Sequence, residues 1–199
     1  RFGWTKAEAV LPLTVFLVVF ALTMVPAGAL QDRLGPRAVA TAGALLFFVA
    51  YALAALVGWS GSPWWLVTSY GLLGGAACGL TYACIAPPVR KWYPDRPALA
   101  VSTAVMGFGL AALVVAPVKS EYLIVVHGIE GTFVAIGVAT LLVSLAAARM
   151  LRNPPPGWSP PGTPAAAAAP AADLSPAQIW RTARFWQVWL AFASVISGG

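Results

Sequence analysis

Long apolar stretches separated by short polar segments dominate this sequence. Long apolar stretches without Asp, Glu, Lys, Arg or His cover residues 9–31, 38–89, 98–118 and 131–148. A helix needs about 20 mainly apolar residues to cross the hydrocarbon core of a bilayer. The second stretch is long enough for two crossings, and the glycines and proline of residues 58–63 divide it. The pattern therefore predicts five complete membrane-spanning helices, near residues 7–30, 38–58, 64–88, 98–118 and 131–150, with a sixth beginning around Arg184.

The composition agrees with insertion into a bilayer. Hydrophobic residues make up 60% and charged residues 9% of the 199 residues, whereas a soluble domain averages about 25% charged residues. A secretory signal peptide would be followed by a polar mature domain, but here apolar segments recur to the last residue. We therefore predict an all-α, multi-pass membrane protein. Because residue 1 is Arg and the final residues lie in an apolar run, we expect the chain to be truncated at both ends.

The basic residues follow the predicted topology. The net charge is +6, and nine of the twelve Lys and Arg residues fall in segments on one side of the predicted spans: Arg33, Arg37, Arg90, Lys91, Arg96, Arg149, Arg152, Arg181 and Arg184. Short loops rich in Lys and Arg stay cytoplasmic. The first span therefore runs from outside to inside, and the later spans alternate consistently. The excess of basic residues therefore reflects the membrane topology. We expect these charges to lie at the bilayer surface, and we expect no nucleic-acid partner.

Residues 151–176 interrupt the membrane pattern. This segment is rich in proline and alanine and cannot bury a core, so we expect a cytoplasmic linker between two membrane units. Residues 1–150 would form the first unit, and residues 177–199 would begin the second. Ser175 and Pro176 form a typical helix start, with serine as the cap and proline at the first helical position.

Glycines spaced by four mark the third span. Gly71, Gly75 and Gly79 lie on one helix face, and at about 100° per residue Tyr82 falls on the same face. Small residues allow helices to pack closely in lipid. Two interpretations remain open: the ridge packs against another helix, or it lines a central cavity where Tyr82 offers its hydroxyl or ring to a ligand. Gly107 and Gly109 permit a similar close approach in the fourth span.

The chain offers little for catalysis. Cys78 and Cys84 lie inside one span and are expected to be buried apolar residues. His127 has Lys119, Glu121 and Glu130 nearby in sequence, but the predicted topology places them in a solvated outer loop. We therefore predict no enzyme activity, no cofactor and no metal site.

The loop after the first span carries a specific motif. Gly28, Asp32, Arg33, Gly35 and Arg37 match the pattern Gly-x-x-x-Asp-Arg-x-Gly-[Arg or Pro]-Arg. This loop resembles the signature loop of the major facilitator superfamily. The resemblance implies a conformational latch, in which the glycine permits close helix approach between two halves and the carboxylate pairs with arginine and a helix dipole. A carboxylate near a helix N-terminus gains about 0.3–1 kcal/mol.

A second string narrows the resemblance. The loop after the third span contains Lys91, Trp92, Pro94, Asp95 and Arg96, and a Gly-Phe-Gly follows at residues 107–109. This string is similar to the oxalate:formate antiporter branch, although Pro97 stands where the branch usually has a basic residue. The resemblance implies an incomplete N-terminal six-helix bundle, comprising family helices two to six and the start of helix seven. The C-terminal half would then be missing from this chain.

The resemblance implies secondary transport of small organic anions by alternating access. Because no charged residue or histidine lies at mid-membrane depth, the expected cavity contacts are Tyr82, with Ser102 and Met106 as weaker candidates, and the cations come from the missing half. A proton-coupled efflux pump for hydrophobic compounds, and a non-transporting membrane sensor or scaffold, remain as alternatives. The expected location is a bacterial cytoplasmic membrane.

Overall fold

The computed structural model describes residues 3–155, 158, 182–183 and 185–187. The chain divides into two compact units, Arg1–Thr163 and Pro164–Gly199, and the first contains almost all the described residues. The described part of the first unit is helical and contains no strand, so the all-α prediction is confirmed. Most of the predicted linker 151–176, the helix start at Ser175 and most of the sixth span lie outside the described residues.

The first two spans form helices α1 (Lys6–Leu34) and α2 (Pro36–Ala54). Thr5 caps α1 with a capping box, because its hydroxyl accepts the Glu8 backbone N–H while the Glu8 carboxylate accepts the Thr5 backbone N–H. Gly35 alone separates the two helices, with φ 84° and ψ 157°. A residue with a Cβ rarely adopts such a positive φ, so glycine permits this abrupt reversal.

The third span is built from several pieces. After the short α3 (Val57–Ser60), the span comprises α4 (Pro63–Leu66), the π-helix η1 (Val67–Gly74), α5 (Gly75–Ala83) and α6 (Ala86–Trp92). The break before α6 coincides with the Pro87–Pro88 pair, which has no backbone N–H groups to donate to the preceding turn. A break therefore separates α5 from α6 near the C-terminal end of this span, a feature that the hydropathy pattern does not indicate.

The last two spans join without the loop that we expected. Helix α7 (Pro97–Pro117) continues through the π-helix η2 (Val118–Leu123) into α8 (Ile124–Met150). The chain reverses at Gly128, where φ is 68° and ψ is −176°. The segment between these spans is therefore helical apart from the turn at one glycine, which differs from the loop that we expected, whereas Lys119, Glu121 and His127 are exposed, as expected of a solvated segment.

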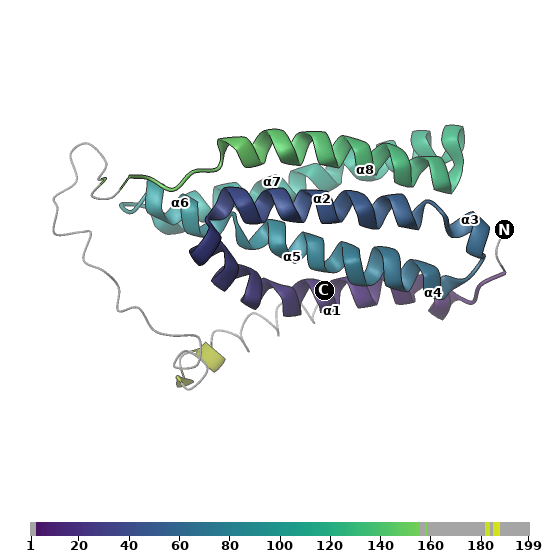
Figure 1. Cartoon of the computed structure of the whole chain (residues 1–199), viewed down its shortest axis with the longest axis horizontal. Helices are drawn as coiled ribbons and strands as arrows, with labels where there is room; N and C mark the ends of the chain where they lie inside the picture. Colours follow the sequence, from purple (N-terminus) through teal and green to yellow (C-terminus); the bar gives the residue numbers. More distant parts are fainter. Residues whose placement is uncertain (1–2, 156–157, 159–181, 184, 188–199) are drawn as a thin grey trace. The chain divides into compact units, whose positions relative to one another are not determined.

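The long helices form a bundle in which α1, α2, α5 and α8 run roughly along one direction (Figure 1). Helix α1 packs on η1 and α5, and α2 packs between α5 and α8. Helix α2 approaches α5 closely at Gly43, where an added Cβ would lie 2.5 Å from the Thr81 hydroxyl oxygen. Val39, Ala40, Cys84 and Ala148 form a buried cluster.

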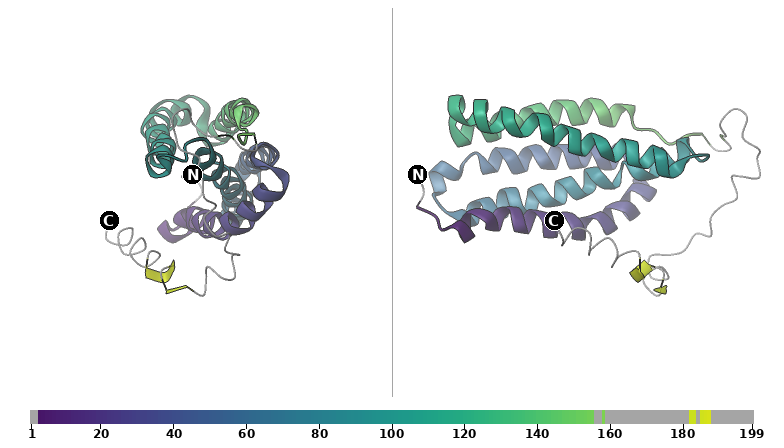
Figure 2. Two further views of the ribbon diagram at one scale, coloured as in Figure 1. Left: turned by 90° about the vertical axis from the view of Figure 1, so that its left-hand side faces the viewer. Right: turned by 180° about the vertical axis from the view of Figure 1, so that it is seen from behind.

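The helix ends segregate along the bundle. The C-terminal ends of α1, α6 and α8 lie at one end of the bundle, and the turn near the start of α8 lies at the other (Figures 1 and 2). Four segments of the described chain are long and apolar enough to cross a membrane: Lys6–Leu34, Pro36–Ser60, Pro63–Trp92 and Pro97–Met150. The last contains 54 residues, and its reversal at Gly128 divides it into two arms that run in opposite directions (Figure 2).

Candidate functional site

The glycine ridge of the third span lies directly against α1. A Cβ at Gly71 would lie 3.0 Å from the Pro12 carbonyl oxygen, and one at Gly75 would lie 2.5 Å from the Phe16 carbonyl oxygen. A Cβ at Gly79 would meet the Cβ of Thr23 at 2.8 Å. Each glycine therefore lets the backbone of one helix approach the other. The sequence left two interpretations open, and these contacts support the one in which the glycine ridge packs against another helix.

Tyr82 lies just beyond this ridge, where α1, α5 and α7 meet. Its ring makes edge contacts with Phe20, at 5.5 Å between ring centroids, and with Phe108, at 6.1 Å. Such geometry is favoured between aromatic rings. We call Phe20, Tyr82 and Phe108 the ring triad. Tyr82 is half-buried, so part of the residue stays accessible although its ring is held between two phenylalanines.

The other two candidate cavity residues lie on α7 at exposed positions. The Ser102 hydroxyl donates to the Leu99 carbonyl oxygen at 3.0 Å within the helix, and Met106 is 57% exposed. Phe108 is the α7 side chain that contacts the Tyr82 ring. The sequence-based prediction included it in the Gly-Phe-Gly motif but not among the cavity residues, because a motif on one span does not show which helix faces it.

Three glycines that were expected to permit close helix approach have open space around them. No atom lies within 4 Å of the position of a Cβ at Gly28, Gly107 or Gly109. Helix α7 has no buried residue. The close packing expected at Gly107 and Gly109 is thus not formed within the described part of the chain, and any partner of these surfaces lies beyond it.

A second aromatic cluster occupies the opposite half of the bundle. Tyr70 stacks on Phe16 at 5.1 Å and makes an edge contact with Tyr51 at 5.8 Å, and Tyr51 contacts Phe133 at 5.6 Å. Tyr51, Tyr70 and Phe133 border a cavity of about 330 Å³ that Lys119 also lines. The four rings come from four helices, α1, α2, η1 and α8, so no local spacing in the sequence could group them.

The signature loop lies at the junction of α1 and α2. Asp32, Arg33 and Arg37 are exposed, and Gly35 makes the reversal between the helices. The neighbouring Gln31 is only 1% exposed, and neither its Oε1 nor its Nε2 has a hydrogen-bond partner in the described structure. The charged side chains are thus available to a partner, whereas Gln31 is enclosed by the bundle.

Trp92 in the second loop motif ties two distant segments together. Its indole N–H donates to the Arg152 carbonyl oxygen at 2.7 Å, and its ring contacts Trp158 at 5.0 Å between centroids. Lys91, Asp95 and Arg96 are exposed, and Pro94 is half-buried. Trp92 therefore fixes the path of the chain where it leaves α8.

We expect Trp92→Phe to loosen this connection while the bundle stays folded. Phenylalanine retains an aromatic ring but cannot donate a hydrogen bond, and one such bond contributes about 0.5–1.5 kcal/mol. Amide hydrogen exchange should therefore become severalfold faster at residues 151–155 and stay unchanged in α1 and α2. Trp59→Phe provides the control, because Trp59 is exposed at the other end of the bundle. Unchanged exchange at residues 151–155 in the Trp92 variant would contradict the anchoring role.

The chemistry available in the described spans is that of recognition. Aromatic faces and the tyrosine hydroxyls can contact a small ligand, and a hydroxyl can donate a hydrogen bond to a carboxylate. The charge-free stretches supply no carboxylate or histidine at mid-membrane depth that could relay protons. Permanent charge is concentrated at the ends of the helices.

Comparison with known proteins agrees with this arrangement. The sequence profile of the Major Facilitator Superfamily matches residues 1–199. The chain is 26% identical to the oxalate:formate antiporter of Oxalobacter formigenes over 99% of its own length and 45% of the relative. It is 32% identical to an uncharacterized 38 kDa protein in a 23S RNA operon of Thermoproteus tenax, over 94% of the chain and 44% of that protein. A probable chloroplastic anion transporter 4 of Arabidopsis thaliana is 30% identical over 70% of the chain and 26% of the relative. The chain thus spans less than half the length of these relatives.

Proposed function

The chain belongs to the Major Facilitator Superfamily, and on that premise we propose that it forms part of a secondary transporter for small organic anions. Members of this superfamily are multi-pass membrane transporters and not enzymes. The proposed substrates are mono- and dicarboxylates, exchanged across a bacterial cytoplasmic membrane by alternating access. A second membrane unit of the same transporter completes the substrate path.

The ring triad is the observation that carries this proposal. Tyr82 presents a hydroxyl at the junction of α1, α5 and α7, and its ring is held by Phe20 and Phe108. Helix α7 has no buried residue, which leaves this side of the junction available to a further membrane unit. A hydrogen-bond donor between aromatic walls suits a carboxylate, provided that a cation also faces it. We assign that cation to the second unit, since the charge-free spans offer none at this depth.

Two further facts favour an anion exchanger over a proton-coupled efflux pump. One of the relatives is an oxalate:formate antiporter and another is a probable anion transporter. The spans also lack a carboxylate or histidine that could take up and release protons at mid-membrane depth. Exchange of one anion for another requires no such group.

The signature loop supplies the conformational control in this proposal. Asp32 is exposed at the end of α1, beside the sharp reversal at Gly35. We assign its carboxylate to a latch that docks on a helix N-terminus or an arginine of the second unit in one of the two transport states. The latch biases a two-state equilibrium and takes no part in chemistry.

The role of the Tyr82 hydroxyl is tested by Tyr82→Phe and Tyr82→Ala in the full-length gene product. A hydrogen bond to a charged group contributes about 1.5–3 kcal/mol, so Tyr82→Phe should raise the KM for a labelled carboxylate about tenfold or more. The phenyl ring retains the contacts with Phe20 and Phe108. Tyr82→Ala should lose these contacts as well and reduce transport further.

Tyr122→Phe is the matched control, because Tyr122 is 59% exposed on η2 and belongs to neither aromatic cluster. The measurement is initial-rate uptake into liposomes over a range of substrate concentrations. Equal KM values for wild type and Tyr82→Phe would show that the Tyr82 hydroxyl does not contact the substrate.

A further inference from the structure

Gln31 differs from the other buried polar side chains of the described chain, which belong to Ser69 and Thr132. The Ser69 hydroxyl donates to the Trp65 carbonyl oxygen at 2.6 Å. The Thr132 hydroxyl donates to the Gly128 carbonyl oxygen, also at 2.6 Å. Gln31 is 1% exposed, and neither its Oε1 nor its Nε2 has a hydrogen-bond partner among the described residues. Its amide is therefore enclosed without hydrogen bonds in this arrangement of the helices.

An enclosed amide without partners opposes the packing around it. The side chain of Gln31 has two N–H donors and a carbonyl acceptor. Leaving a buried group of this kind unpaired changes an equilibrium constant about fivefold or more. Leucine at the same position would fill a similar space without this cost. The cost points to a second arrangement of the helices in which the amide is paired.

The register of α1 against the third span shows what lies at the level of Gln31. The second and third glycines of the glycine ridge lie against Val19 and Thr23 respectively. A step of four residues along the third span thus matches a step of four along α1, and the two helices run in the same direction. Two further steps place Gln31 level with Pro87. Gln31 and the neighbouring Pro88 are both buried, which agrees with this placement.

The break in the third span offers hydrogen-bond acceptors at this level. Pro87 and Pro88 have no backbone N–H groups. The carbonyl oxygens four residues earlier, those of Ala83 and Cys84, therefore lack the donors that a continuous helix supplies. A helical side chain is tilted toward the start of its helix, which directs Gln31 toward the level of these oxygens. Donors and acceptors that the helices leave unpaired thus lie at one level of the bundle.

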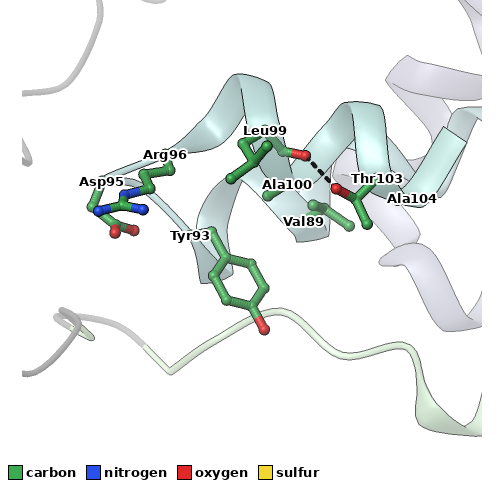
Figure 3. A pocket seen from close by; sticks show the side chains of 8 residues that line it. All are labelled: Val89, Tyr93, Asp95, Arg96, Leu99, Ala100, Thr103 and Ala104. Carbon is green, nitrogen blue, oxygen red and sulfur yellow. Dashed lines mark hydrogen bonds between the residues drawn. The ribbon is translucent and has the colours of Figure 1, made fainter. Parts of the chain in front are cut away.

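Helix α6, beyond the break, is held mainly on its other side. It packs on α7 and only slightly on α5. Val89 of α6 and Leu99 and Ala100 of α7 line a pocket of about 410 Å³ between these two helices (Figure 3). The pocket leaves room for α6 to shift by about 1–2 Å, the size of shift with which packed helices switch between arrangements.

We propose that Gln31 biases the equilibrium between the two transport states through a hydrogen bond that only one state contains. In the described arrangement the amide is enclosed without a partner among the described residues. In the other state, a shift of the break against α1 brings the Ala83 or Cys84 carbonyl oxygen to the Gln31 Nε2, which donates to it. Because the hydrogen bond exists in one state alone, it favours that state. The inference rests on the proposed alternating-access function and is independent of which substrate is carried.

Gln31→Leu tests this role in the full-length gene product, with Cys84 as the reporter. Cys84 is 0% exposed beside the break, so its reaction with a membrane-permeant maleimide reports departure from the described arrangement. Mass spectrometry of the peptide that contains Cys84 gives the rate, in the absence of substrate. Gln31→Leu removes the unpaired amide and should slow this labelling about fivefold or more. The substrate exchange rate should fall as well, while the thermal stability stays the same or rises.

Thr132→Val is the matched control, because it also replaces a buried polar side chain by an apolar one of similar size. The Thr132 hydroxyl bonds within its own helix, so its loss should leave the rate of Cys84 labelling unchanged.

A double-mutant cycle tests the partner of Gln31. Pro87→Ala together with Pro88→Ala restores two N–H groups to the third span, and these occupy the carbonyl oxygens at the break. This variant should also slow Cys84 labelling. Adding Gln31→Leu should slow it no further than the stronger of the two changes, because both remove the same hydrogen bond.

Three results would overturn the proposal. The first is unchanged or faster Cys84 labelling in Gln31→Leu. The second is independent, multiplying effects of Gln31→Leu and the proline replacements. The third is lower thermal stability of Gln31→Leu, which would show that the amide is paired in the described arrangement. Because the labelling requires no substrate, failure of the wild type to exchange carboxylates would count against the proposed function and not against this inference.

Discussion

Replacing Gly75 by leucine is expected to prevent correct packing of the third span against α1. A Cβ at this position would lie 2.5 Å from the Phe16 carbonyl oxygen and 3.1 Å from the Val19 Cβ. The nearest atom belongs to the backbone of α1, so a rotamer change cannot relieve the clash. Gly75 has an ordinary helical φ of −61° and ψ of −46°, and the effect is therefore steric and not conformational. Overpacking of this kind costs about 1–3 kcal/mol and occasionally more.

Gly107→Leu is the matched control for this prediction. It introduces the same side chain into a membrane-spanning helix, but no atom lies within 4 Å of a Cβ at Gly107. Size-exclusion chromatography in detergent and a thermal unfolding curve should show a large loss of folded protein for Gly75→Leu and little change for Gly107→Leu. A reversed order would mean that α7 is closely packed in the complete protein and that the contact between α1 and α5 is dispensable.

Asp32→Asn is expected to leave the protein folded and to impair transport. The carboxylate is exposed, so its replacement by an amide of similar size disturbs no core packing. A carboxylate at a helix N-terminus contributes about 0.3–2 kcal/mol, which corresponds to roughly a two- to thirtyfold shift in a two-state equilibrium. Loss of the charge should therefore shift the population of the two transport states and lower the exchange rate.

The control is Glu121→Gln, which neutralises an exposed carboxylate on η2 at the other end of the bundle. The measurements are folded yield, exchange rate and accessibility of an introduced cysteine on the cytoplasmic side. Asp32→Asn should change the last two and not the first. If Asp32→Asn and Gly75→Leu lost folded protein to the same extent, Asp32 would be a structural residue and the latch assignment would be wrong.

Hydropathy and charge predicted an all-α membrane protein because the bilayer restricts the structures that can cross it. A bilayer requires every backbone polar group to be satisfied inside the segment, so charge-free stretches such as residues 9–31 and 98–118 become helices. The glycines at positions 71, 75 and 79 indicated close packing for a similar reason, since their spacing forms one smooth surface. The sequence does not show which helix faces these glycines, so it could not decide whether they form a packing ridge or line a cavity.

Features that depend on contacts between helices could not be predicted. The cluster of Tyr51, Tyr70 and Phe133 joins three helices, and Phe108 became noticeable only because α7 brings it to Tyr82. The reversal at Gly128 was missed for another reason. The charged residues around it suggested a solvated loop, but lysine, glutamate and histidine are compatible with a helix at the membrane surface, and one glycine with a φ of 68° is sufficient for the turn.

The central claim is that the transporter containing this chain exchanges small organic anions, and counterflow in liposomes tests it most directly. The full-length gene product would be reconstituted with unlabelled oxalate or formate inside the vesicles, and uptake of a labelled carboxylate would be followed with and without a pH gradient. The account predicts rapid uptake that depends on the internal carboxylate and persists without the gradient. Failure to exchange any carboxylate, together with gradient-driven transport of a hydrophobic compound, would contradict it.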